Sequence, residues 1–171
     1  MVATGILAIL ATSMVSLFIQ NYRTARVLSL RTQAVTSALT ILEQIKFLQY
    51  TQVNDVYLKG ASGSFDVRLA DPATSGSNGF MTVSIPVNVL DGSTVNSTWK
   101  EVNVYVDKTS GAPPLPMKFF LCLTKNKATS GTKVDLFEVV ILYQWLTQGR
   151  STSQWQTGNV RLVVPSLNPM S

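Results

Sequence analysis

The N-terminal segment constrains the fold of this chain more than any other part of its sequence. Residues 2–19 include no charged side chain. As an α-helix, this segment would rise about 27 Å, which is most of the hydrocarbon thickness of a bilayer. A buried core helix is one interpretation, but such a helix normally keeps a polar face. A cleaved signal peptide is another, but no basic residue precedes the run and no Ala-x-Ala cleavage site ends it.

The helical pattern continues well past this apolar run. Gly5 is the only glycine before Gly60, and the first proline is Pro72. From position 27 onward the apolar residues recur every three or four positions, which is the spacing of one helix face. We therefore expect one unbroken helix from the start of the chain to about Asn54, with a length of about 80 Å.

Such a helix would carry two different surfaces. Residues 1–20 are expected to form a membrane-spanning or filament-core segment, and residues 21–54 an amphipathic half that packs on a globular domain of residues 55–171. The residues expected to contact lipid or neighbouring helices are Val2, Ile6, Leu7, Ile9, Leu10, Met14, Val15, Leu17 and Phe18. Those expected to pack on the globular domain are Val27, Leu30, Ala34, Ala38, Ile41, Ile45 and Leu48.

Residues 55–171 show the pattern of a β-sheet domain, in which short apolar runs are separated by turn signals. The expected strands are Phe65–Leu69, Phe80–Val87, Glu101–Asp107, Lys118–Thr124, Asp135–Leu146 and Val160–Val164. Several of them alternate apolar and polar side chains, which is typical of an antiparallel sheet with one buried face. No second helix of useful length is apparent. The expected fold is therefore α+β, with the long helix packed on an antiparallel sheet.

The side chains that most catalytic and metal sites need are scarce. The chain contains no His and one Cys, Cys122, which lies in an apolar strand and is expected to be a buried thiol. Its nine acidic residues do not cluster, and neither phosphate-binding glycine motif is present. We therefore expect no catalytic residue, no cofactor and no metal site, and a protein that is not an enzyme.

The charge of the chain is sparse and basic. Charged residues make up 13% of the chain, against about 25% in an average soluble domain, and the formal net charge is +5. Arg23, Arg26 and Arg31 follow the apolar run, where lipid head groups would accept them. A nucleic-acid surface is an alternative partner site, but the lysines alternate with acidic residues, which favours ordinary solvated charge. The lysines concerned are Lys100, Lys118, Lys125, Lys127 and Lys133.

Two stretches resemble a known superfamily. The first is residues 1–11, MVATGILAILA. The second comprises residues 99–106, WKEVNVYV, together with Tyr143-Gln144-Trp145 and Gly149-Arg150 near the end of the chain. Combined with the helix-then-sheet order, they resemble type IV pilins and pilin-like proteins, a superfamily that includes the type II secretion pseudopilins. The second stretch is similar to minor-pilin-like members.

The resemblance begins just beyond the family's processing site. Family precursors carry a basic leader that ends in glycine, and a glutamate lies near the mature N-terminus. Met1 aligns a few residues beyond that glutamate. We therefore expect either that the true beginning precedes Met1 or that this member departs from the processing rule. No residue here is assigned as the glutamate, the cleavage site or a methylated terminus.

The resemblance implies a structural subunit of a type IV pilus-like extracellular helical filament. Such subunits wait in the inner membrane by their apolar half-helix, and an ATPase-driven platform then extracts them into a cell-surface filament. The implied partners are copies of the chain, the inner-membrane assembly platform and, before assembly, the membrane itself. Alternatives are a single-span membrane-anchored binding or sensor domain, or a minor pilin or pseudopilin of a secretion or DNA-uptake machine.

Overall fold

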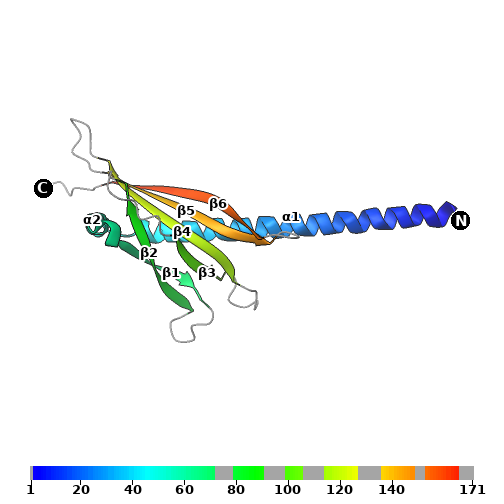
Figure 1. The fold of residues 1–171 in the computed structure, drawn as a ribbon, viewed down its shortest axis with the longest axis horizontal. Helices are drawn as coiled ribbons and strands as arrows, with labels where there is room; N and C mark the ends of the chain where they lie inside the picture. Colours follow the sequence, from blue (N-terminus) through cyan, green and yellow to red (C-terminus); the bar gives the residue numbers. More distant parts are fainter. Residues whose placement is uncertain are drawn as a thin grey trace.

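The computed structural model describes residues 2–71, 79–90, 99–105, 114–126, 136–148 and 153–165. Two helices, α1 (Val2–Lys46) and α2 (Tyr50–Leu58), and one turn of 3-10 helix (Gly60–Ser62) precede the strands β1 (Ser64–Ala70), β2 (Phe80–Val89), β3 (Lys100–Val104), β4 (Leu115–Asn126), β5 (Leu136–Gln148) and β6 (Ser153–Pro165). The fold class is α+β, as predicted, with α1 against the sheet and extending far beyond it (Figure 1). Asp135 and residues 106–107, which were also predicted to lie in strands, are outside the described residues.

The sheet is mixed, and the prediction of a wholly antiparallel sheet is wrong at one pair of strands. The strand order is β1-β2-β4-β5-β6, with β3 paired to β4. Four of the pairings are antiparallel, but β2 runs parallel to β4 over Val87–Val89 and Leu121–Leu123. Side-chain alternation has the same period in both kinds of pairing, so the sequence pattern does not distinguish them. Figure 1 shows that β1 and β2 diverge from the strands β3, β4, β5 and β6.

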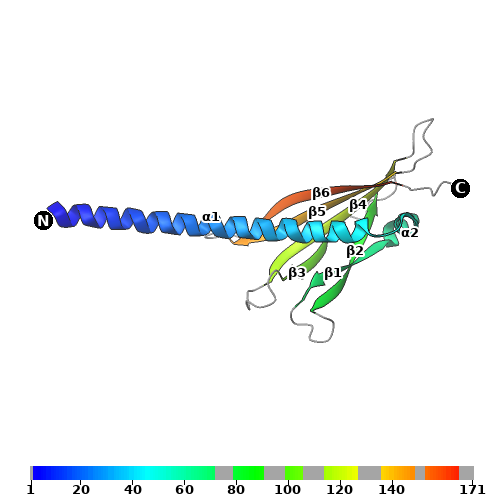
Figure 2. The ribbon, with the colours of Figure 1, turned by 180° about the vertical axis from the view of Figure 1, so that it is seen from behind.

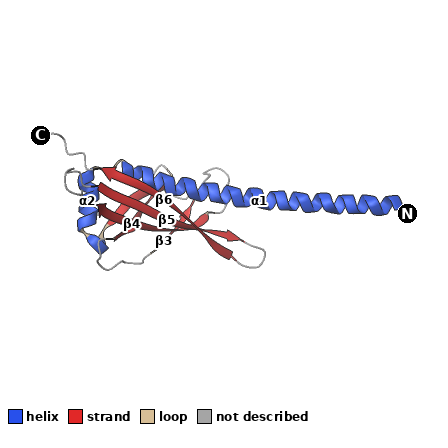
Figure 3. Ribbon diagram, turned by 90° about the horizontal axis from the view of Figure 1, so that it is seen from above, coloured by secondary structure: helices blue, strands red, loops and turns tan. Residues whose placement is uncertain are grey.

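The long helix ends earlier than predicted, and a second helix follows it. α1 ends at Lys46 rather than near Asn54, and α2 begins at Tyr50. No glycine or proline marks this break, but the Gln49 backbone N–H donates to the Gln52 side-chain oxygen at 2.9 Å, as in a capping box. The turn brings Val53 into the core, where it is fully buried. α2 therefore closes the end of the sheet opposite the free end of α1 (Figure 3).

The last strand is longer than predicted. β6 begins at Ser153, seven positions before the expected start at Val160, and it ends at Pro165, one position after the expected end at Val164. Most side chains from Ser153 to Thr157 are polar and all are exposed, so apolar alternation does not mark this part of the strand. Its pairing with β5 instead continues as far as Gln148 opposite Ser153. Main-chain hydrogen bonding thus extends the strand beyond its apolar half.

The core lies between the second half of α1 and the inner face of the sheet. Four residues at helical spacing on α1 are completely buried. They are Ala34, Ala38, Ile41 and Ile45, and they pack in one cluster with alternate residues of β4 and β5 such as Phe119, Leu121, Phe137, Val139 and Ile141. The two alanines let the helix backbone approach the sheet closely. Each fully buried isoleucine contributes about 1.5–3 kcal/mol relative to an exposed one.

A glutamine of α1 also secures the sheet edge formed by β1. The Gln44 side-chain amide donates to the Arg68 carbonyl at 2.8 Å, and the Arg68 backbone N–H donates to the Gln44 side-chain oxygen at 2.7 Å. Gln44 thus takes the place of a neighbouring strand at this residue and satisfies two main-chain groups of an edge strand.

We expect Gln44→Ala to lower the free energy of unfolding by about 1–2 kcal/mol, because two main-chain groups of Arg68 lose their partner. Urea denaturation of the full chain in detergent micelles measures the change. Gln33→Ala is the matched control, since the Gln33 amide donates only weakly, at 3.3 Å, to the Ser29 hydroxyl within the same helix. Equal stability of the two variants would contradict the role given to Gln44.

A close contact between neighbouring strands requires glycine at position 158. Gly158 of β6 lies opposite Tyr143 of β5, and a Cβ atom placed on Gly158 would overlap the Tyr143 ring. Burial among apolar groups raises the pKa of Tyr143, and the nearby Arg31 guanidinium partly opposes that effect. Because the Tyr143 ring occupies the space that a side chain at position 158 would need, glycine fits there and a larger residue does not.

Gly158→Ala should destabilise the sheet domain by about 1–3 kcal/mol, because the Tyr143 ring must shift within a packed layer. Thermal unfolding followed by circular dichroism tests this. Gly5→Ala serves as the control, since an added Cβ there meets nothing within 4 Å and the residue belongs to the exposed first part of α1. An unchanged melting temperature in Gly158→Ala would show that the ring moves freely.

Candidate assembly and membrane surface

The described side chains of the first part of α1 are exposed. Every described side chain before Leu30 is exposed, Leu30 is half-buried, and Ala34 is the first fully buried residue. We call residues 2–29 the free half of α1. At 1.5 Å per residue it is about 42 Å long. Figure 2 shows it leaving the strands as a straight extension of the docked part of the helix.

Residues 2–19 of the free half are apolar on all sides. The large residues predicted to contact lipid or other helices are exposed, at Ile6 57%, Leu7 72%, Ile9 68%, Leu10 60%, Met14 63%, Val15 58%, Leu17 59% and Phe18 73%. The side chain of Val2 lies outside the described residues. Successive helix residues are rotated by about 100°, so these side chains point in every direction around the axis. In length and composition, α1 is sufficient to cross a membrane.

Three hydroxyl groups within the free half have hydrogen-bond acceptors in the same helix. The Thr12 hydroxyl donates to the Ala8 carbonyl at 2.9 Å, and the Ser13 hydroxyl donates to the Ile9 carbonyl at 2.8 Å. Nearer the sheet, the Thr24 hydroxyl donates to the Gln20 carbonyl at 3.0 Å. Because these donors are satisfied one turn earlier in the same helix, an apolar environment would leave none of them unpaired. The surface is therefore suited to lipid or to other helices.

A short basic stretch separates the apolar run from the sheet domain. Arg23 and Arg26 are the first charged residues of the chain, and the first acidic residue is Glu43. Tyr22, beside Arg23, is 71% exposed. Tyrosine and arginine at the end of an apolar run favour the head-group layer of a membrane. The free half thus has the order of a membrane anchor, with an apolar run followed by an interfacial aromatic and cations.

The predicted helix–sheet contacts begin one turn later than the sequence pattern indicates. Leu30 and Leu48 are half-buried against the core, but Val27, which was expected to pack on the sheet, is 52% exposed. The sheet ends near Leu30, where Arg26, Leu30, Gln33, Leu146 and residues 114–116 line a cavity of about 190 Å³. The apolar spacing of the helix therefore continues past the point where the sheet can cover it.

Three exposed apolar residues of the free half were missed by the sequence analysis. Ile19, Tyr22 and Leu28 are 45%, 71% and 55% exposed. A comparison of lengths would have indicated their exposure. α1 measures about 68 Å and the longest strands only about 43 Å, so the sheet cannot cover the whole helix. At the far end of the molecule, Phe47 and Leu58 are 86% and 71% exposed. No sequence signal marked those two residues as exposed.

Cys122 is buried, and burial raises the pKa of its thiol, which disfavours the nucleophilic thiolate. No group of three or more Cys, Asp or Glu among the described residues could hold a metal ion. Lys118 pairs with Glu101 at 2.5 Å, and its ammonium also lies 4.5 Å from the centre of the Trp155 ring.

Lys118 and Lys125, two of the lysines considered for a nucleic-acid surface, both contact other side chains. Lys125 lies over the rings of Phe137 and Tyr57, at 5.4 Å and 6.0 Å. Lys127 and Lys133, which were considered for a nucleic-acid surface, are outside the described residues.

Comparisons of the chain with protein-family models, with curated proteins and with solved structures found no match. Its function is therefore inferred from its own surfaces.

The stability of the sheet domain should fall in alkaline solution. Because burial raises the pKa of Cys122, the unfolded thiol ionises first, at about pH 8.5, and the unfolded state then binds fewer protons than the folded state. The contribution of Cys122 to the free energy of unfolding should stay constant below that pH and decrease as the pH rises further. Urea titrations at about pH 7 and about pH 9.5 measure it. Cys122→Ala should reduce the decrease, and identical pH profiles would contradict burial of the thiol.

Proposed function

We propose that this chain is a structural subunit of a type IV pilus-like helical filament, which polymerises through the free half of α1. One observation carries the proposal: one unbroken helix is exposed and apolar on every side over residues 2–19 and is docked on a sheet domain over its second part. The subunit would be held in the inner membrane before assembly and would lie in an extracellular cell-surface filament afterwards.

The exposed apolar area of the free half supports this proposal. Soluble monomers rarely expose contiguous apolar patches of more than a few hundred Å², and this helix exposes large apolar residues over five turns. Exposing such a surface to water costs about 25 cal/mol of free energy per Å² of apolar area. Lipid covers the helix in the membrane, and neighbouring helices would cover it in a filament core. Transfer between the two environments then costs little, because one apolar surround replaces another.

The continuity of α1 favours a filament subunit over a tethered receptor domain. A membrane-anchored binding or sensor domain usually has a flexible linker after its span. Here the helix is uninterrupted from Val2 to Lys46, and the docked residues follow the free half within one turn. Copies of this chain that packed their free halves side by side would therefore hold their sheet domains at fixed positions around the filament.

The surface of the sheet domain is compatible with the outside of such a filament. Its exposed strand residues are mainly uncharged hydroxyl and amide side chains, for example Thr82, Ser84, Asn103, Gln154 and Thr157. Neutral surfaces of this kind avoid like-charge repulsion between closely spaced copies. The remaining partner in the proposal is the inner-membrane platform that would drive extraction.

Electron microscopy of material sheared from the cell surface tests the proposal. Helical filaments whose repeating density fits this chain, with α1 in the core, would support it. A protein that stays monomeric in the inner membrane while the sheared fraction holds no filament would overturn it and favour the anchored domain.

Ala8→Asp and Ala11→Asp should each abolish filament yield, because an unpaired charge in an apolar bundle or bilayer costs several kcal/mol. Negative-stain microscopy and membrane fractionation measure the effect. Asn126→Asp is the matched control, since it adds the same charge at an exposed position at the end of β4. Normal filament yield from both helix variants would contradict the role proposed for the free half.

A further inference from the structure

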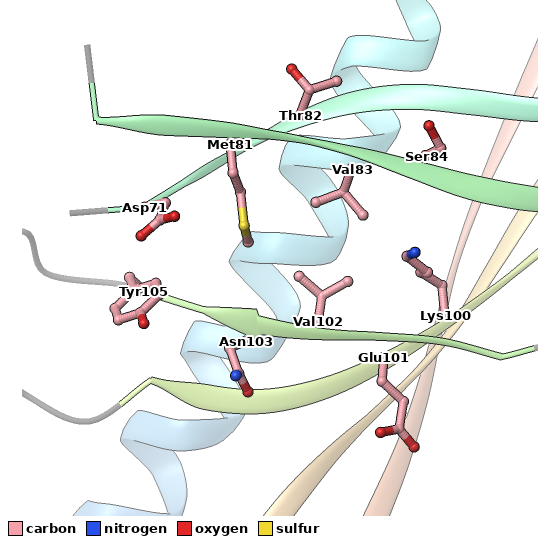
Figure 4. Close-up of a pocket in the computed structure, with 10 residues that line it drawn as sticks. All are labelled: Asp71, Met81, Thr82, Val83, Ser84, Lys100, Glu101, Val102, Asn103 and Tyr105. Atoms are coloured by element: carbon pink, nitrogen blue, oxygen red, sulfur yellow. The ribbon is translucent and has the colours of Figure 1, made fainter. Parts of the chain in front are cut away.

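The sheet forks at β4, and the fork leaves a groove between two strands. β2 and β3 both pair with the same edge of β4: β2 with Leu121–Leu123, and β3 with Leu115–Phe119. Before Val87, β2 leaves β4 and continues beside β1 alone. Residues 81–84 of β2 and 100–103 of β3 then face one another across a groove of about 560 Å³ (Figure 4).

The hydrogen bonds of the β1–β2 pair show which main-chain groups of β2 face this groove. The Asp71 N–H donates to the Gly79 carbonyl, and the Val87 N–H donates to the Gly63 carbonyl, both at 2.9 Å. In an antiparallel pair, bonding alternates from residue to residue. The odd-numbered residues of β2 therefore bond to β1. The N–H and C=O groups of Thr82 and Ser84 point to the opposite side, toward β3.

The same reasoning identifies the groups of β3 that face the groove. The Leu90 N–H donates to the Leu123 carbonyl at 3.0 Å, so odd-numbered residues of β4 direct their main-chain groups toward β2 and β3. In the register of the β3–β4 pair, Lys100 and Val102 lie opposite odd-numbered residues and bond to β4. Glu101 and Asn103 must then direct their N–H and C=O groups toward β2. Among the described residues, no strand pairs with residues 81–84 of β2 or 100–103 of β3 on the side that faces the groove.

Side chains give the groove an apolar floor with a cation at one end. Figure 4 shows Met81, Val83 and Val102 within the gap, with α1 behind them. Val83 and Val102 are each 8% exposed and belong to the core. Lys100 extends from β3 into the gap and makes no ion pair with a described residue, whereas the neighbouring Glu101 pairs with Lys118. The groove thus presents main-chain donors and acceptors on both walls, apolar side chains below, and one ammonium group.

We propose that this groove accepts an extended peptide, which enters as an additional strand between β2 and β3. An extended segment is the ligand that satisfies two facing strand edges at once. At about 160 Å³ per residue in a packed sheet, the groove holds about three residues. Residues two apart on a strand share a face, so the peptide should place an apolar side chain over Val83 and Val102 and, two positions along, an acidic side chain near Lys100.

Fluorescence anisotropy with the full chain in detergent micelles tests the proposal. The probe is a labelled peptide of about seven residues in which valine alternates with threonine and one valine near the end is replaced by glutamate. We expect saturable binding. A peptide with the same side chains and N-methylated central amides should bind at least about tenfold more weakly, because it lacks the donors for the strand edges. Equal binding of the two peptides would overturn the proposal.

Variants of the protein locate the peptide in the groove. Thr82→Pro removes a main-chain donor that faces the groove and leaves the bonds to β1 in place, so it should weaken binding at least about fivefold. Thr82→Ala is the matched control and should bind normally, since it keeps the donor. Lys100→Glu should weaken binding of the glutamate peptide and strengthen binding of a peptide with lysine at the same position. This readout does not depend on whether the proline variant folds.

Two results would overturn this assignment. One is an affinity that neither Thr82→Pro nor Lys100→Glu changes. The other is a dimer of the chain that Thr82→Pro dissociates while no peptide binds, since the groove would then belong to a contact between copies. Neither measurement involves filament formation, so the outcome is separate from that of the proposed function.

Discussion

The packing of residues 30–46 of α1 on the inner face of the sheet is the interaction on which the rest of the structure depends. The sheet brings together strands that are far apart in the sequence, and the helix covers their shared apolar face. The Gln44 side chain then secures the edge strand β1 by two hydrogen bonds with main-chain groups of Arg68. Without this docking the free half of α1 would be an isolated apolar helix, and the sheet would expose its core.

The sequence predicts which face of α1 docks on the sheet, but it does not predict where the docked part of the helix begins and ends. The spacing of Ala34, Ala38, Ile41 and Ile45 identifies the buried face of the helix because burial on a helix follows its period. The same spacing includes Val27, which is exposed, because periodicity carries no information about where the sheet ends. The break before Tyr50 was missed because a pair of glutamines, rather than glycine or proline, forms the cap.

The two candidate sites differ in how far sequence could reveal them. The free half of α1 is visible in the sequence because it depends on composition alone: a long run without charge. The groove between β2 and β3 depends on which strand edges are paired, and the parallel pairing of β2 with β4 has no signature in side-chain alternation. Thr82 and Ser84 are ordinary exposed strand residues in the sequence. Only the hydrogen-bond pattern shows that their main chain faces an open edge.

The absence of a break anywhere in α1 between Val2 and Lys46 has a mechanical consequence. Each residue of helix sets a rotation of about 100° and a rise of about 1.5 Å, so the angular position of the sheet domain is fixed by the residue count of the free half. A force applied to the free half is transmitted directly to the sheet domain, because no flexible segment lies between them. The free half therefore acts as a rigid shaft, and the addition or loss of one residue within it would turn the whole domain to face a different direction.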